Sequence, residues 1–265
     1  YLYVASYYQR RVFRVKLSNG KCNWNQHANY PRNVAISKNN ILYVGHGSGL
    51  LVRNLSTNTN ISCSASGNLW YIRYAFGTAV DPSASNIYVQ YSRYLYRFAI
   101  QGNHCPSTSY ASRAYRSSWQ YGYGMRFHPT NDYILYATSY YEHKLYKFTL
   151  SAQRNVFSSA QSMGRCCTGA STSSNIRLYY PAGVAIDTTN NRVFVANYYK
   201  HAITVFDLNL GFIKEFGGSA GTRMSGAHEA IKAIVTDSSL TAGVNFGFAY
   251  WASGGGAGFS SWSGN

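Results

Sequence analysis

One short strand motif recurs five times along the chain and limits the folds that the chain can adopt. Each copy alternates apolar residues with polar or small ones over about five positions. The copies are LYVAS at Leu2, LYVGH at Leu42, IYVQY at Ile87, ILYAT at Ile134 and VFVAN at Val193. The intervals are 40, 45, 47 and 59 residues when the copies are aligned on Ala5, Gly45, Gln90, Ala137 and Ala196. The chain is therefore a series of sheet-forming units.

Units of 40–50 residues that hold several short strands are typical of β-propeller blades. The last unit offers four strands, AGVAID, RVFVAN, AITVFDLN and FIKEFGG, separated by the turns TTNN and NLG. The second unit offers RNVAIS, ILYVGH, LLVRNL and NISCSAS. No helical periodicity occurs before about residue 222. We predict an all-β fold in which residues 1–218 form a propeller of five to six four-stranded blades.

The sequence YPAGVAIDTTNNRVFVANYYKHAITVFDLNLGFIKEFGG, residues 180–218, resembles an NHL repeat along nearly its whole length. That repeat has a Pro-Gly start, an inner strand ending in Asp, a V-A-[DN] strand, a polar turn, an I-x-V-F-D strand and a closing F-G. The other four units keep the strand order but few signature residues. The resemblance implies a β-propeller, and it places YYKH on the turn between the second and third strands.

Two further stretches repeat this turn, YYQRRVFRV from Tyr7 and YYEHKLYKF from Tyr140. The resemblance places all three on equivalent turns of different blades, on one face of the disc. Neighbouring blades hold such turns more than about 10 Å apart, so Arg10, His143 and His201 are not expected to share one metal ion. We predict a binding face of aromatic and cationic side chains instead. Its residues are Tyr8, Arg10, Tyr141, His143, Tyr199 and His201.

The charge of the chain favours anionic partners. Lys and Arg number 24 against 8 Asp and Glu, a net charge of +16, although charged residues make up 12% of the chain. Such an excess attracts nucleic acid, acidic polysaccharide or an anionic envelope. The cations alternate with aromatics, as in RVFRVK, which places them on solvent-facing sides of strands. No run of 18 apolar residues occurs, so no transmembrane segment is predicted.

The five cysteines, Cys22, Cys63, Cys105, Cys166 and Cys167, lack the spacing of a structural zinc site. We predict disulfides in an oxidising compartment, which together with the charge-poor composition favours an extracellular or cell-surface location. Cys22, Cys63 and Cys105 fall on or just before the outermost strands of different blades, too far apart to pair with one another. We expect Cys105 to bond to the RCCTG segment inside the insertion 158–179. The alternative is a bond between Cys166 and Cys167.

Residues 219–265 differ from the repeats. TRMSGAHEAIKAIVTD has helical spacing, and VNFGFAYWAS alternates as a strand does. Residues 222–265 resemble the first helix and second strand of the von Willebrand factor A domain of type IV pilus tip and assembly adhesins. The metal site of that family needs D-x-S-x-S before the helix, and FIKEFGGSAG lacks it, so no metal ligand is assigned. The alternative is a propeller-closing extension, in which GVNFGFAYW supplies the innermost strand that the first unit lacks.

Motifs for covalent chemistry are missing: the sequence has no G-x-S-x-G, HExxH or P-loop. Asp81 and Asp187 close the inner strands of two blades, where they either cap turns or form an acid–base pair near the axis. Some NHL propellers are lyases that hold zinc with three axial histidines, and His128 ends an inner strand where such a ligand stands. Others bind single-stranded RNA on a basic face.

From these observations we predict a secreted or cell-surface binding or adhesion protein, a component of a pilus or another surface appendage. It acts by multivalent non-covalent contacts with other protein subunits or with an anionic glycan, and it is not an enzyme. No cofactor is assigned; calcium or another divalent cation stays open, without named ligands. One alternative is a metal-dependent lyase or hydrolase with a site on the propeller axis. A second is single-stranded nucleic-acid binding, which ranks below protein and glycan.

Overall fold

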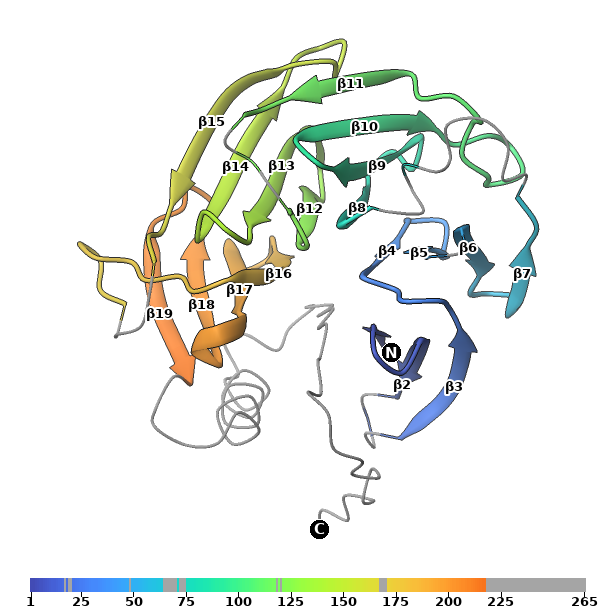
Figure 1. The fold of residues 1–265 in the computed structure, drawn as a ribbon, viewed down its shortest axis with the longest axis horizontal. Helices are drawn as coiled ribbons and strands as arrows, with labels where there is room; N and C mark the ends of the chain where they lie inside the picture. Colours follow the sequence, from blue (N-terminus) through green and yellow to red (C-terminus); the bar gives the residue numbers. More distant parts are fainter. Residues whose placement is uncertain are drawn as a thin grey trace.

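The computed structural model describes residues 1–16, 18, 21–47, 49–63, 71, 75–117, 119, 121–166 and 171–217. These residues form five antiparallel sheets that follow one another along the chain and lie like sectors of a disc (Figure 1). A short 3-10 helix, η2 (Tyr198–Lys200), lies between the second and third strands of the last sheet. The predicted all-β propeller is therefore confirmed, with five blades in the described part of the chain.

The first blade has three strands, β1 (Leu2–Ser6), β2 (Arg11–Val15) and β3 (Cys22–His27). The second has β4 (Asn33–Ile36), β5 (Ile41–His46), β6 (Gly49–Asn54) and β7 (Thr59–Ile61). The third has β8 (Gly77–Val80), β9 (Asn86–Tyr91), β10 (Tyr94–Ala99) and β11 (Ser112–Tyr115). The fourth has β12 (Met125–His128), β13 (Asn131–Ser139), β14 (Lys144–Leu150) and β15 (Phe157–Met163). The fifth has β16 (Pro181–Asp187), β17 (Arg192–Asn197), β18 (Ala202–Asp207) and β19 (Phe212–Gly217).

The innermost strands β4, β8, β12 and β16 form the hub of the disc (Figure 1). In the first blade, β1 aligns in sequence with the second strands β5, β9, β13 and β17. Among the described residues, no strand pairs with the hub side of β1. The segment GVNFGFAYW, residues 243–251, lies outside the described residues, as does the whole predicted helix-and-strand unit 219–265.

Successive side chains of β13 point to opposite sides of the sheet and pack against two different blades. In β13, Leu135 and Ala137 belong to a core cluster that includes Tyr88 of the third blade. Tyr136, between them, points to the opposite side and packs in a cluster with Val184 of the fifth blade. Both sides of the strand are covered by neighbouring blades, so this strand is apolar at nearly every central position.

Glycines allow the inner strands to approach one another at backbone distance. A Cβ atom on Gly77 of β8 would lie 2.0 Å from the carbonyl oxygen of Gly122, which precedes β12. A Cβ atom on Gly124 would lie 2.7 Å from the carbonyl oxygen of Ala182 in β16. No side chain fits at these distances. The contacts between the third, fourth and fifth blades therefore depend on glycine.

An asparagine ties three blades together at the same end of the hub. The Nδ2 atom of Asn33, at the start of β4, donates to the carbonyl oxygen of Tyr123 at 2.7 Å. It also lies 3.5 Å from the carbonyl oxygen of Thr78 in the third blade. A side chain of the second blade thus contacts the segment that leads into the fourth, and the hub is narrow here.

A buried ion pair joins the third and fourth blades near the opposite face. Arg154, between β14 and β15, donates from Nη1 to Asp81 at 2.8 Å and from Nη2 to Asp132 at 3.0 Å. Asp81 also accepts the backbone N–H groups of Ser85 and Asn86 at 2.9 and 3.0 Å. Asp81 therefore caps a turn, which is one of the two roles that its position in the sequence predicted.

The disulfide between Cys63 and Cys105 corrects two predictions. Its Cα atoms lie 5.5 Å apart, whereas we expected no bond among Cys22, Cys63 and Cys105 and a bond from Cys105 to the insertion 158–179. The prediction placed the cysteines on or just before the outermost strands and was wrong because it took the separation of those strands as the separation of Cys63 and Cys105. Cys63 follows β7 and Cys105 precedes β11, so both lie in loops outside the strand ladder.

These loops leave their own blades and meet at the rim. The hydroxyl of Tyr43, in the second blade, donates to the carbonyl oxygen of His104 at 2.9 Å, next to the disulfide. Cys166 is also disulfide-bonded, and Cys22 is a free, exposed thiol. Cys167 lies outside the described residues.

Replacement of Gly77 by alanine is expected to destabilise the fold, because the new methyl group meets a backbone carbonyl rather than a movable side chain. We expect the free energy of unfolding to fall by about 1–3 kcal/mol in a urea titration. Gly102→Ala is the matched control, since a Cβ atom there meets nothing within 4 Å. It should change stability by no more than about 0.5 kcal/mol. Equal losses in the two variants would contradict the role of close approach at the hub.

Asp81→Asn keeps the size of the side chain but removes the carboxylate that faces Arg154. We expect a loss of about 3 kcal/mol in the free energy of unfolding, since the buried guanidinium of Arg154 then keeps only the partly exposed Asp132 as its counter-ion. Asp132→Asn should cost less, because that side chain is 20% exposed whereas that of Asp81 is fully buried. Thermal or urea unfolding of both variants measures the difference, and the reverse order would refute the assignment.

Candidate binding face

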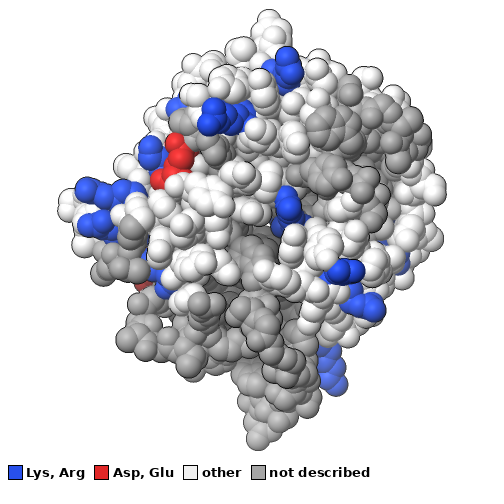
Figure 2. Space-filling model, in the orientation of Figure 1, with Lys and Arg blue, Asp and Glu red and all other residues white. Residues whose placement is uncertain are grey.

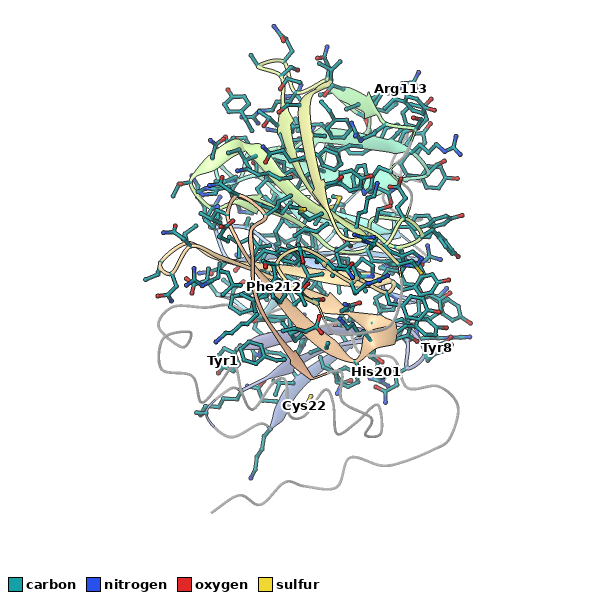
Figure 3. The ribbon with its side chains drawn as sticks, turned by 90° about the vertical axis from the view of Figure 1, so that its left-hand side faces the viewer. Tyr1, Tyr8, Cys22, Arg113, His201 and Phe212 are labelled. Carbon is teal, nitrogen blue, oxygen red and sulfur yellow. A yellow bond between two sulfur atoms is a disulfide. The ribbon has the colours of Figure 1, made fainter. Side chains whose placement is uncertain are left out.

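The segments that lead into the inner strands emerge on the same face of the disc as the turns between second and third strands. In the fourth blade, Met125 at the start of β12 pairs with Ala137 near the end of β13. Figure 3 shows Tyr8 and His201, from the corresponding turns of the first and fifth blades, on one side of the molecule. We call this side the tyrosine face. It comprises Tyr7, Tyr8, Arg10, Tyr30, Arg32, Phe76, Tyr121, Tyr123, Tyr140, Tyr141, His143, Tyr179, Tyr180, Tyr198, Tyr199 and His201.

All six residues predicted for the binding face lie here. The second tyrosine of each pair is exposed: Tyr8 by 66%, Tyr141 by 56% and Tyr199 by 44%. The first tyrosine of each pair is half-buried. Each pair thus has one ring packed into the surface and one in solvent. The role of these residues in binding remains a prediction.

The second residue after each pair adopts the left-handed backbone conformation, which explains why the motif repeats. The φ angles are 53° for Arg10, 59° for His143 and 53° for His201. In two of the turns this residue closes the loop with a backbone hydrogen bond, Arg10 to Tyr7 at 3.2 Å and His201 to Tyr198 at 3.3 Å. A type I turn followed by a left-handed residue is a common hairpin connection. Glycine or asparagine usually occupies that position. The presence of Arg10 and His143 there is therefore explained by contacts that their side chains make.

Each of these two side chains contacts a tyrosine that precedes the next inner strand. The guanidinium of Arg10 lies over the ring of Tyr30, 4.4 Å from its centroid, and donates to its hydroxyl. The backbone N–H of Tyr180 donates to Nδ1 of His143 at 3.1 Å, and the two rings meet edge to face at 4.6 Å. Arg10 and His143 therefore hold their own tyrosines and do not converge on a common ligand.

The tyrosines that precede the inner strands were not among the predicted binding residues. Tyr30, Tyr121 and Tyr180 have φ angles of 55°, 52° and 54°. Positive φ is strained for a bulky residue, and such strain is concentrated at functional sites. A signal was present in the sequence, since each of the three is followed by proline or glycine at the start of a blade.

The rings of the tyrosine face touch one another across the blades. Arg32 bridges Tyr7 and Phe76, with its guanidinium 5.7 and 4.6 Å from the two ring centroids. From Phe76 the ring contacts continue to Tyr121 at 4.4 Å, and from Tyr121 to Tyr141 at 4.9 Å. The last steps run from Tyr141 to Tyr180 at 6.0 Å and from Tyr180 to Tyr199 at 4.9 Å. Most of these pairs are edge-to-face or tilted, the preferred geometry of aromatic pairs.

The charges around this face are dispersed. Figure 2 shows Lys and Arg as separate patches on the side facing the viewer, with few acidic side chains among them. Glu142 accepts the hydroxyl of Tyr146 at 2.8 Å. Lys200 is buried and paired with Glu215 at 2.6 Å, so it adds little to the surface charge. The face is therefore mainly aromatic, with isolated cations.

Burial disfavours the charged form of three groups on this face, His143, Tyr123 and Tyr140. It lowers the pKa of His143 below its ordinary value, in agreement with the hydrogen bond that its Nδ1 accepts. Burial also raises the pKa of Tyr123 and of Tyr140, and the surrounding tyrosines raise that of Tyr140 further. At neutral pH these phenols are neutral hydrogen-bond donors.

The other candidate positions have structural roles or lie elsewhere. Asp187 caps its turn by accepting the N–H of Thr189 at 2.9 Å and the side-chain amide of Asn190 at 2.7 Å. His128 borders a pocket of about 390 Å³ between the fourth and fifth blades, together with Lys147 and Asp207. In the described part of the chain, no three His, Cys, Asp or Glu side chains are placed to hold a metal ion. No helix within those residues is long and apolar enough to cross a membrane.

Comparison with known proteins supports the fold. A family model described as NHL repeat matches residues 178–206. The match ends before residue 219, so the resemblance of residues 222–265 to a von Willebrand factor A domain gains no support. No curated protein matches the chain.

Several solved structures share the architecture at low sequence identity. A functionally unknown protein from Desulfotomaculum acetoxidans DSM 771 matches with a TM-score of 0.53 and 15% identity over 78% of this chain. The chain spans 63% of the length of that protein. Hydrazine synthase of Kuenenia stuttgartiensis has a TM-score of 0.53 and 11% identity, covering 87% of this chain and 82% of the other. A protein of unknown function from Bacteroides caccae has a TM-score of 0.53 and 8% identity, covering 80% and 71%. Likeness at this level shows the fold alone.

The lowered pKa of His143 predicts a loss of stability in mild acid. Both folded and unfolded states carry a neutral imidazole above about pH 7, and below about pH 6.5 the unfolded state takes up the proton first. Burial also lowers the pKa of His128, with Lys147 contributing. We therefore expect the free energy of unfolding to fall as the pH drops from 7 toward 5.

His143→Gln and His128→Gln should each reduce the change of the unfolding free energy with pH, by at most about 1.4 kcal/mol per pH unit. The double variant should be nearly flat if the two sites act independently. Urea titrations at several pH values measure the slopes. A full acid slope in the double variant would show that other groups are responsible.

Proposed function

We propose that this protein binds another protein subunit of a surface assembly through the tyrosine face, by multivalent non-covalent contacts. The proposal rests on the row of side-chain contacts that runs from Tyr7 through Arg32 to Tyr199, and on the exposed rings Tyr8, Tyr141 and Tyr199 along it. Tyrosine is among the side chains enriched in binding hot spots, because it offers a large apolar area together with one hydroxyl.

The packing of the exposed rings supports this proposal physically. Tyr141 contacts Tyr121, Tyr140 and Tyr180, and Tyr199 contacts Tyr179, Tyr180 and Tyr198. A ring held by several neighbours loses little conformational freedom when a partner covers it. The exposed area is thus preorganised for binding.

Charge and disulfides support the choice of partner and place. The net charge of +16 attracts anionic surfaces and speeds association with them. The Cys63–Cys105 disulfide and the disulfide-bonded Cys166 are typical of an oxidising compartment, so we place the protein at the cell surface or outside the cell. A pilus or a similar appendage is the kind of assembly that we propose.

An anionic glycan is the second candidate partner. Arg10 and Arg32 lie against aromatic rings of the same face, and cations beside flat rings suit sulfated or carboxylated sugars. Single-stranded nucleic acid would use the same chemistry. The three partner classes differ in how strongly their binding depends on salt and on the tyrosines.

The test replaces Tyr8, Tyr141 and Tyr199 together with alanine in the full chain. We expect at least a tenfold loss of affinity for purified surface appendages of the source cells, because several hot-spot side chains are removed. Thermal unfolding should be almost unchanged, since these three rings are exposed. Tyr1→Ala with Tyr133→Ala is the matched control, because these tyrosines are 56% and 41% exposed and lie at strand ends away from the tyrosine face.

Heparin and a single-stranded oligonucleotide serve as competing probes in the same binding assay. If either binds more tightly than the appendages, with steep salt dependence and no effect of the three tyrosines, the proposal fails. A large loss of thermal stability in the triple variant would instead show that the rings are packing groups.

A further inference from the structure

Arg126 is placed at the hub, on the side of the fourth blade that faces the fifth. It lies in β12, and its neighbours Met125 and Phe127 point into the core shared with the third blade. Alternation places Arg126 on the other side of the strand. Its partner across the ladder is Tyr136, whose hydroxyl donates to the carbonyl oxygen of Leu208 in the fifth blade at 2.7 Å.

The guanidinium of Arg126 has few partners. It makes one hydrogen bond, from Nη1 to the carbonyl oxygen of the preceding residue, Met125, at 3.0 Å. Among the described residues, the ion pairs join Arg154 to two aspartates and Lys200 to Glu215, and none includes Arg126. A guanidinium carries five N–H donors, so most of the donors of Arg126 are available to a ligand.

Two other arginines of the same chain make more side-chain hydrogen bonds. Arg154 contacts two carboxylates and the hydroxyl of Tyr88. Arg53 donates to the side-chain oxygen of Asn60 at 2.6 Å and to both oxygens of Asn58 at 2.5 and 2.8 Å. Arg126 departs from this pattern although it lies in an innermost strand.

The environment of Arg126 disfavours an uncompensated charge. Burial lowers its pKa to about 10, so the side chain is still a cation at neutral pH. Lys147 faces the same side of the blade, because it pairs with Tyr136 as Arg126 does. Asp207, an acid near this side, accepts the N–H groups of Asn209 and Gly211 at 2.7 Å and thus caps its own turn. A desolvated cation without a counter-ion is costly, and an anion relieves that cost.

We propose that the hub binds an oxyanion, a carboxylate or phosphate group, through the guanidinium of Arg126. The planar fork of arginine matches two oxygens of such a group, which favours it over a monatomic anion. This site is separate from the tyrosine face and does not depend on the partner proposed there. It would accept a small anionic ligand or an acidic group of a partner.

The experiment follows thermal unfolding of the full chain while inorganic phosphate replaces chloride at constant ionic strength. Phosphate at tenfold its dissociation constant should raise the Tm of the unmodified protein by about 3–6 °C, and above that concentration the Tm should rise with the logarithm of the phosphate concentration. Arg126→Met should be more stable than the unmodified protein in chloride and should lose the phosphate response. Arg126→Gln, which retains a polar side chain, should also lose the response, and acetate in place of phosphate shows which oxyanion is preferred.

Arg192→Met is the matched control. Arg192 also bonds to the carbonyl oxygen of its preceding residue, Asn191, at 3.4 Å, but it lies in the second strand of its blade, at the start of β17 and opposite Asp187 at the end of β16. This variant should respond to phosphate as the unmodified protein does. The Nε–H resonance of Arg126 in the unmodified protein should shift as phosphate is added, and the shift should give the same dissociation constant as the thermal unfolding data.

Two outcomes would overturn the proposal. Equal phosphate responses in the unmodified protein and in Arg126→Met would place the bound anion elsewhere. A lower Tm of Arg126→Met in chloride would show that the chain already compensates this charge internally.

Discussion

The close backbone approach of the inner strands is the constraint on which the rest of this structure depends. Gly77 and Gly124 allow neighbouring blades to meet where a side chain would collide with main chain. Short distances at the hub bring the segments that precede the inner strands together on one face. The tyrosines on those segments are therefore near enough to touch across blade boundaries. The close approach of the inner strands thus determines both the packing at the hub and the ring contacts on the tyrosine face.

The repeat period, the alternation and the turn residues were sufficient to predict the architecture and the shared face of Tyr8, Tyr141 and Tyr199. Those features depend on local pattern, which a sequence displays directly. The contacts of Tyr30 with Arg10 and of Tyr180 with His143 could not be predicted from pattern, because they join residues 20 and 37 positions apart in the chain. The Cys63–Cys105 bond was missed for a related reason: it depends on where two loops travel after leaving their blades. The lack of an ion pair at Arg126 likewise follows from where the fold places the acids of the described residues.

The scarcity of carboxylates shapes the surface of the protein. Of its 8 acidic residues, Asp81, Asp132 and Glu215 neutralise Arg154 and Lys200, and Asp187 and Asp207 cap turns. Few acids are left to balance the cations on the outside. The positive field therefore extends into solvent with little internal cancellation, while the aromatic rings supply short-range contact. The cations thus provide the long-range attraction, and the aromatic rings provide the direct contacts.

The rim disulfide has a mechanical consequence. It closes a loop between residues 63 and 105, a separation of 42 residues that contains the strands β8, β9 and β10. A tensile load applied to the two ends of the chain passes through the covalent bridge and bypasses everything inside that loop. The strands β8, β9 and β10 therefore carry none of this load themselves. Their folding still depends on the second and fourth blades, which complete the core on either side of them.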